Sequence, residues 1–131
     1  MDRRTFVFQA LGILAASAVN ADAAVRDVAS PNHPEPRPGI TAANVLKAEQ
    51  VASGKEEFDM VREIPHIVDG IRCPCGCSDR EGYYSLLSCF EGEGMAQNCR
   101  MCRNCARTAH RLHGEGKDLN AIRAAIDERF D

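Results

Sequence analysis

The stretch Cys73-Pro74-Cys75-Gly76-Cys77 places three thiols within five residues, and no other part of the chain is as unusual. A second cluster, Cys99-Arg100-Met101-Cys102-Arg103-Asn104-Cys105, adds three more, and Cys89 lies between the two. The chain has 131 residues, and all seven of its cysteines lie between positions 73 and 105. A small domain buries a limited part of its surface and often needs disulfides or bound metal for stability. Fold and function must therefore account for seven sulfur atoms in one short window.

The first cluster cannot be helical. Residues two apart on a helix point about 200° apart, so Cys73, Cys75 and Cys77 would diverge. The residue before Pro74 must be extended, and Gly76 allows the backbone to turn with a positive φ. These features predict a tight loop that gathers three sulfur atoms around one point.

The second cluster predicts the start of a helix. Asn98 is a good N-cap, and the helix is expected to run from Cys99 to about His113. Cysteines three residues apart lie side by side on such a helix, as a pair of metal ligands requires. His110 and His113 share this face but lie eight or more residues beyond Cys102, about 12 Å along the axis. We expect them to be helix-end residues rather than ligands of the same metal.

A helical hairpin is expected to end the domain. Gly114 should close the cysteine-bearing helix, and Asp118 should cap a last helix over residues 119–130. The apolar side chains of the last helix recur at helical spacing, which predicts packing against the cysteine-bearing helix. They are Leu119, Ile122, Ile126 and Phe130. The predicted fold is all-α, a cysteine-rich loop packed on a C-terminal helical hairpin.

Shorter helical segments are expected before the hairpin. Thr41 can cap one over about residues 42–51, and a 3.6-residue apolar period predicts another over about residues 58–64, ended or bent by Pro65. Residues 82–90 are expected to form a further short helix. Its Cys89 is either a fourth metal ligand or a buried thiol. His66 is expected to be partly exposed.

Arginines surround the cysteines in the sequence. They have two interpretations, which are compatible with each other: a solvated basic face, or a set of charges that lowers the thiol pKa values and offsets thiolate charge. The residues concerned are Arg72, Arg80, Arg100, Arg103, Arg107 and Arg111.

Residues 1–23 have the pattern of an export signal rather than of a folded segment. An apolar run follows Arg3-Arg4 but is too short for a confident membrane span, and Ala21-Asp22-Ala23 matches a cleavage site. The string from Arg3 to Val7 resembles the twin-arginine signal, which engages the export machinery and implies transport of an already folded protein. An ordinary secretory leader is the alternative. We expect a periplasmic or extracellular protein, tethered to the membrane if the signal is not cleaved.

A proline-rich linker is expected over residues 24–40, ahead of a cysteine-rich helical domain over residues 41–131. Its four prolines, Pro31, Pro34, Pro36 and Pro38, disfavour helices and sheets and favour an extended, flexible spacer. His33 in this spacer is expected to be solvated.

Several short motifs follow one another in a specific order. They are Pro65, Cys73 to Cys77, Ser85, Cys89-Phe90, Cys102 with Cys105, Gly116-Lys117, Ile122-Arg123 and Ile126-Asp127. With these motifs the chain from about Phe58 to Phe130 resembles a family of small exported bacterial proteins named for a Pro-Cys-Tyr-Cys-Gly-Cys motif, whose function is unestablished. The resemblance implies a helical cysteine-rich domain and no particular activity. Arg72 and Pro74 depart from the family motif, and Cys99 is an addition.

Metal binding is the function that the cysteines favour. Thiolates select soft or borderline ions such as Zn, Cu(I) or the iron of iron–sulfur clusters. We expect Zn or Cu(I) here, for storage or for delivery to another exported protein as partner. The candidate ligands are Cys73, Cys75, Cys77, Cys89, Cys99, Cys102 and Cys105. Seven thiols exceed one four-ligand site, so the surplus fits a second ion or a multi-copper cluster. Folded export would allow loading before the thiols meet an oxidising compartment.

Two alternatives remain open. Small exported domains are commonly held by disulfides, although seven cysteines leave one thiol over. Cys99 with Cys102, and Cys102 with Cys105, also have the spacing of cysteine pairs in thiol–disulfide redox proteins, although the expected strand context is missing. The formal net charge of −3 gives no indication of nucleic-acid binding. We find no catalytic constellation and do not expect an enzyme.

Overall fold

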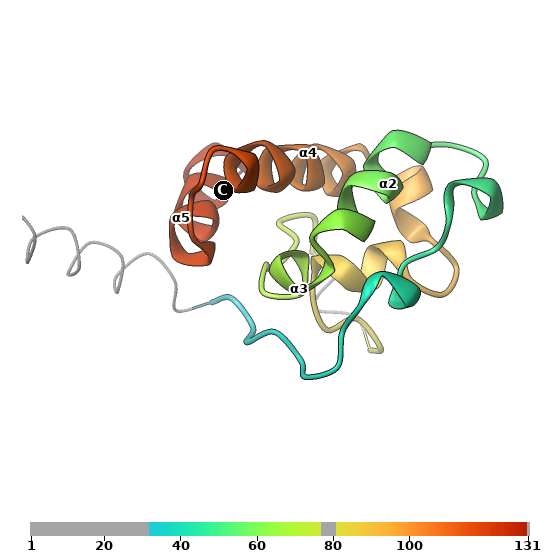
Figure 1. Ribbon diagram of the computed structural model, residues 1–131, viewed down its shortest axis with the longest axis horizontal. Helices are drawn as coiled ribbons and strands as arrows, with labels where there is room; N and C mark the ends of the chain where they lie inside the picture. Colours follow the sequence, from blue (N-terminus) through green and yellow to red (C-terminus); the bar gives the residue numbers. More distant parts are fainter. Residues whose placement is uncertain (1–31, 77–80, 131) are drawn as a thin grey trace, which may run out of the picture.

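The computed structural model describes residues 32–76 and 81–130, and in these ranges it contains helices and loops but no strand (Figure 1). The predicted all-α fold is therefore confirmed. The α-helices are α2 (Lys55–Glu63), α3 (Pro65–Val68), α4 (Arg100–Gly114) and α5 (Leu119–Phe130). Two short 3-10 helices precede α2, η1 (Ala42–Asn44) and η2 (Ala48–Gln50), and two lie between α3 and α4, η4 (Leu86–Phe90) and η5 (Met95–Asn98). Across the described part of the chain, no helix has the length and apolar character needed to cross a membrane.

The predicted C-terminal hairpin is present. Helix α4 lies along one side of the molecule, and α5 folds back from its end (Figure 1). Asp118 starts α5 as expected, because its carboxylate accepts a hydrogen bond from the Ala121 N–H at 2.8 Å. The turn differs from the prediction, since Gly114 is still helical and the left-handed residue is Gly116, with φ 87°. The helix gains this extra length because the Glu115 N–H still reaches the Arg111 carbonyl.

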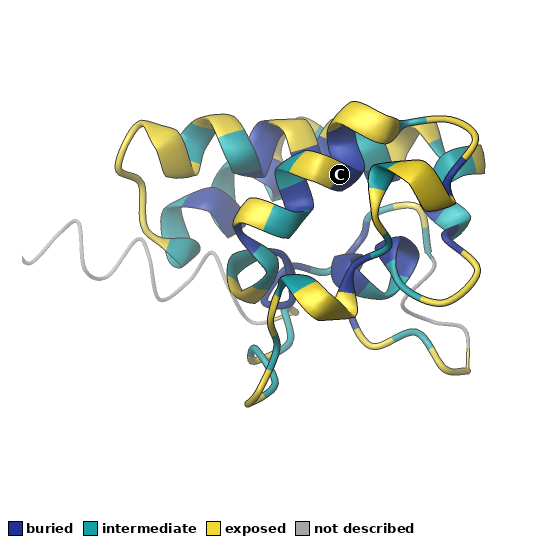
Figure 2. Cartoon of the chain, turned by 45° about the vertical axis from the view of Figure 1, so that its right-hand side comes forward, coloured by how far each residue is buried: buried dark blue, intermediate teal, exposed yellow. Residues whose placement is uncertain are grey.

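The hydrophobic core lies between the hairpin and the elements that precede it. On α5, Ile122 and Ile126 are fully buried, while Leu119 and Phe130 pack at the edge of the core. Phe58 of α2 meets Phe90 of η4 edge to face, with ring centroids 4.8 Å apart. Figure 2 shows that the helices are buried on their inner faces and exposed on their outer ones.

The helix predicted over about residues 42–51 is wrong, because this stretch forms the two short helices η1 and η2. Asn44 turns its amide oxygen back to the Thr41 N–H at 2.9 Å, and Gln50 does the same to the Lys47 N–H at 2.8 Å. These capping boxes begin each helix, but η1 cannot continue, because the Leu46 N–H donates to the Phe90 carbonyl at 3.1 Å and Arg62 binds the Ala42 and Val45 carbonyls at 2.7 and 2.8 Å. The break after α2 is as predicted, since Pro65 occupies the first turn of α3.

The proline-rich segment is not a free spacer where it is described. Arg37 binds the carboxylate of Asp69 through its backbone N–H at 2.7 Å and through its guanidinium at 2.8 Å. Asp69 is fully buried and also accepts the Ser85 hydroxyl at 2.7 Å. This ion pair raises the pKa of Arg37, mainly through the hydrogen bonds with Asp69, and Glu91 adds to the effect. Residues 32–40 are thus attached to the folded domain.

The expectation that His33 is solvated is wrong. Its side chain is 2% exposed. Its Nε2 donates to the Asp127 carboxylate at 2.8 Å, and its Nδ1 accepts the Arg72 N–H at 2.9 Å. The imidazole can be buried because both ring nitrogens have partners. The adjacent Pro34 carbonyl accepts a hydrogen bond from Arg123 at 2.8 Å, which holds the same segment against α5.

Asp69→Asn should destabilise the domain by about 2–3 kcal/mol, because it removes the charge that holds three donors in a buried position. Glu91 pairs with the same Arg37 guanidinium but is more exposed than Asp69. Glu91→Gln should therefore lower the free energy of unfolding by less than about 1 kcal/mol. Urea unfolding followed by circular dichroism measures both. Equal losses of unfolding free energy in the two variants would contradict the conclusion that Asp69 is the more important partner of Arg37.

Candidate metal centre

The first cysteines lie on a tight loop, as predicted. The loop is anchored where the Leu86 N–H donates to the Ile71 carbonyl at 2.8 Å. Gly76 has φ 88°, a conformation that other residues adopt only with strain, and its N–H reaches back to the Cys73 carbonyl at 3.4 Å. Cys73 is fully buried and Cys75 is exposed. The loop therefore directs one thiol into the core and leaves the next at the surface.

The second cysteines lie at the start of α4. The predicted cap, Asn98, is the last residue of η5, and the N-cap is Cys99. Its sulfur accepts a hydrogen bond from the Cys102 N–H at 3.3 Å. The first turn of a helix presents N–H groups that have no intrahelical partner, and this bond satisfies one of them. Cys102 follows in the first turn and is fully buried.

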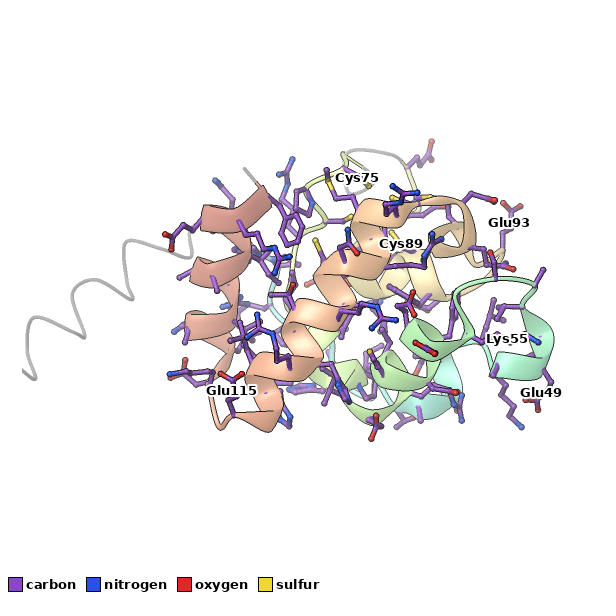
Figure 3. All side chains as sticks on the ribbon, turned by 90° about the horizontal axis from the view of Figure 1, so that it is seen from above. Glu49, Lys55, Cys75, Cys89, Glu93 and Glu115 are labelled. Atoms are coloured by element: carbon purple, nitrogen blue, oxygen red, sulfur yellow. The ribbon has the colours of Figure 1, made fainter. Side chains whose placement is uncertain are left out.

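The sulfur atoms of the two clusters meet around Cys102. Its Sγ lies 2.9 Å from that of Cys99, 3.2 Å from that of Cys73 and 3.5 Å from that of Cys75. The sulfurs of Cys73 and Cys75 are 3.1 Å apart. All these separations exceed the S–S bond length of about 2.05 Å, and no disulfide joins any two of the six described cysteines. Figure 3 shows Cys75 and Cys89 beside the first turns of α4.

Among the cysteines that the structure describes, two groups of three thiols can each hold a metal ion. Cys73, Cys89 and Cys102 form one group, here called the inner group, and all three are buried. Cys75, Cys99 and Cys102 form the other, the outer group, in which Cys75 is exposed and Cys99 is partly exposed. In each group the sulfurs lie within 4.8 Å of one another, and Cys102 belongs to both.

The thiols of the cluster titrate unequally. The Cys102 thiol, and after it the Cys89 thiol, donates a hydrogen bond to the Cys73 sulfur and lowers the pKa of Cys73. The same contact with Cys73 raises the pKa of Cys102, because the proton on Cys102 stabilises the neighbouring thiolate. Without a cation Cys102 therefore keeps its proton and holds the Cys73 sulfur through it. A metal ion can take over that role.

The sulfur spacing suits a metal ion after a small expansion. A Zn–S bond of about 2.3 Å in a tetrahedral site implies sulfurs about 3.8 Å apart. The observed contacts of 2.9–3.5 Å around Cys102 are shorter than this. An increase of less than about 1 Å would admit the ion, which side-chain rotation in the loop and first helical turn can provide.

Other predicted ligands have different places. Cys89 lies on η4, which replaces the helix expected over residues 82–90, and is both buried and part of the inner group. Cys105 is buried one turn beyond Cys102 and belongs to neither group. Cys77 lies outside the described residues. His110 pairs with Glu63 at 2.8 Å, as expected for a residue that is not a ligand.

Several of the arginines pair with oxygen atoms. Arg103 donates to the carbonyls of Ala96 and Gln97 at 2.8 and 2.6 Å, Arg107 pairs with Glu56 at 2.7 Å, and Arg111 pairs with Glu115 at 3.3 Å. For these three the surface interpretation fits the contacts. Arg80 lies outside the described residues. The lowered pKa of Cys73 comes from the neighbouring cysteines.

Sequence reasoning missed the part of His33 in this region. By accepting the Arg72 N–H, His33 fixes the backbone immediately before Cys73. The only sequence signal was a histidine among prolines, which indicates nothing about a partner so far along the chain.

Comparison with family models, with curated proteins and with solved structures finds no match for this chain. The resemblance to the Pro-Cys-Tyr-Cys-Gly-Cys family therefore stays a prediction, and the functional conclusion depends on the geometry of the thiols.

Exposure predicts the order in which the described thiols react. In the reduced, metal-free protein, iodoacetamide should modify Cys75 first and Cys99 next, with Cys73, Cys89, Cys102 and Cys105 protected until the domain opens. Peptide mass spectrometry after timed quenching measures the order. Labelling of Cys89 or Cys105 as fast as Cys75 would contradict the described burial.

Proposed function

We propose that this protein binds a soft metal ion, Zn or Cu(I), through its cysteine thiolates. The observation that carries the proposal is the position of the Cys102 sulfur, within 3.5 Å of the sulfurs of Cys73, Cys75 and Cys99. These residues come from two separate parts of the chain. Thiolate-only sites favour Cu(I), Zn and iron–sulfur clusters over hard cations.

A disulfide scaffold explains this arrangement less well. A disulfide joins two sulfurs and places no requirement on a third. Here one sulfur contacts three others, and a further thiol, Cys89, lies within 4.8 Å of it. A metal ion uses all such neighbours at once, because its ligands surround a single centre. The crowding around Cys102 is thus what a thiolate metal site needs.

The cellular role that fits is storage or delivery of the ion by an exported protein, with a purely structural zinc as the simplest form. The signal-like residues 1–23 support export, and a twin-arginine type of signal would allow the folded protein to be loaded before it crosses the membrane. A receiving partner would be another exported protein. We propose no enzymatic activity.

Cys102→Ala should weaken Zn binding on the order of 100-fold or more, because structural sites distribute about 10–16 kcal/mol over four ligands. Cys105→Ala is the matched control: it removes a buried thiol from the same helix, one turn away, and should leave the affinity nearly unchanged. Competition with a chromophoric zinc chelator measures both variants under reducing conditions.

Two results would contradict the proposal. One is equal loss of affinity in the two variants. The other is protein from its native export route that contains no metal by elemental analysis and three disulfides by thiol counting.

A dithiol redox function is the second candidate, favoured by one contact. The sulfurs of Cys99 and Cys102 are 2.9 Å apart at the start of a helix, and Cys99 is partly exposed. Their oxidation to a disulfide would transfer two electrons and two protons to the disulfide of another exported protein, which becomes a dithiol.

This redox function predicts a reversible disulfide between Cys99 and Cys102, with a midpoint in glutathione buffers between about −180 and −270 mV. Mass spectrometry of alkylated protein across the buffer series measures it. A disulfide that pairs other cysteines, or none in this range, would remove the candidate.

A further inference from the structure

The inner and outer groups differ in access to solvent. Cys73, Cys89 and Cys102 are fully buried, so an ion held by the inner group would lie inside the core. Cys75 is exposed and Cys99 is partly exposed, so an ion held by the outer group would lie at the surface. The two groups have one member in common, Cys102.

We propose that the cluster binds two Cu(I) ions, one in each group, with the thiolate of Cys102 as a bridge between them. This proposal rests on the proposed metal-binding function and specifies its cargo. Each group supplies three thiolates, a set that suits a three-coordinate Cu(I) ion, whereas structural Zn sites take four ligands. Neither group contains a histidine or carboxylate that would favour a harder ion.

The bridge follows from the sulfur positions. The Cys102 sulfur is 3.2 Å from that of Cys73 on the inner side and 2.9 Å from that of Cys99 on the outer side. Two independent sites would need six thiolates, and sharing Cys102 removes one negative charge from a largely buried cluster. Burying unbalanced charge is costly, so the shared form is favoured. The Cys102 N–H also donates to the outer sulfur of Cys99, which offsets part of the remaining charge.

The arrangement implies that the two ions exchange at different rates. A Cu(I) ion arriving from solution reaches Cys75 first, and its binding releases thiol protons to solvent without any change in oxidation state. Passage to the inner group requires exchange of ligands at Cys102. The outer ion can be transferred to a partner at the surface, while the inner ion leaves only when the core opens.

Titration of the full-length, reduced protein with Cu(I) under anaerobic conditions tests the proposal, with a chromophoric Cu(I) chelator as competitor. We expect two equivalents to bind. Excess chelator should then remove them in a fast and a slow phase of equal amplitude. Cys75→Ser, a change at an exposed position, should reduce binding to one equivalent and abolish the fast phase.

Two further variants identify the bridge and the inner group. Cys89→Ser should retain only the fast-exchanging ion, whereas Cys102→Ser should disrupt both groups and lose both the fast and the slow phase. Cys105→Ser is the control and should still bind two equivalents. If Cys89→Ser fails to fold, circular dichroism would show it. The release kinetics of the unmodified protein and of Cys75→Ser would then still test the two-ion proposal.

The outcomes separate this inference from the function on which it depends. Binding of neither Cu(I) nor Zn would remove both proposals. A single equivalent of either metal would leave the metal-binding function in place and overturn the two-ion cluster. More than two equivalents of Cu(I), release in one phase, or equal effects of Cys75→Ser and Cys105→Ser would also overturn it.

Discussion

The convergence of sulfur atoms on Cys102 is the contact on which the rest of this structure depends. It joins a loop with no regular structure to the first turn of α4, the longest of the described helices. The loop has few apolar side chains of its own, so its position depends on the thiols and on the backbone bonds at its ends. Sulfur serves this purpose because a thiol packs like an apolar group when protonated and binds a cation when ionised. The same atoms can therefore act in the core and in the site.

The N-terminal segment stabilises the loop from the other side. Arg37 ties residues 32–40 to the buried Asp69, and Ser85 completes that carboxylate's hydrogen bonds. His33 then reaches the backbone of Arg72, the residue immediately before Cys73. The backbone immediately before Cys73 is thus held by polar contacts that do not involve sulfur. Such supporting contacts reduce the freedom that metal ligands would otherwise lose on binding.

Local patterns in the sequence were sufficient for the hairpin and for the cysteine loop. The apolar spacing from Leu119 to Phe130 and the cap at Asp118 predicted α5, and Pro74 with Gly76 predicted a turn. The helix predicted between Thr41 and Val51 was wrong because tertiary hydrogen bonds, from Leu46 to Phe90 and from Arg62 to two carbonyls of this stretch, replace the bonds of a longer helix. Helix propensity and apolar periodicity contain no information about such bonds. His33 was missed for a related reason, since its partner Asp127 is far away along the chain.

The sequence predicted that cysteines are the candidate ligands, but it could not predict how they divide into two groups. Spacing along a helix brings Cys99, Cys102 and Cys105 into the same region, yet only the packing of α4 decides which sulfurs face the loop. Cys102 faces it and Cys105, one turn further, is buried without joining either group. Cys75 and Cys73, only two residues apart, differ in exposure because the loop turns between them. Burial therefore gives chemically identical thiols different access to solvent, and this difference would allow one ion to be retained while another is exchanged.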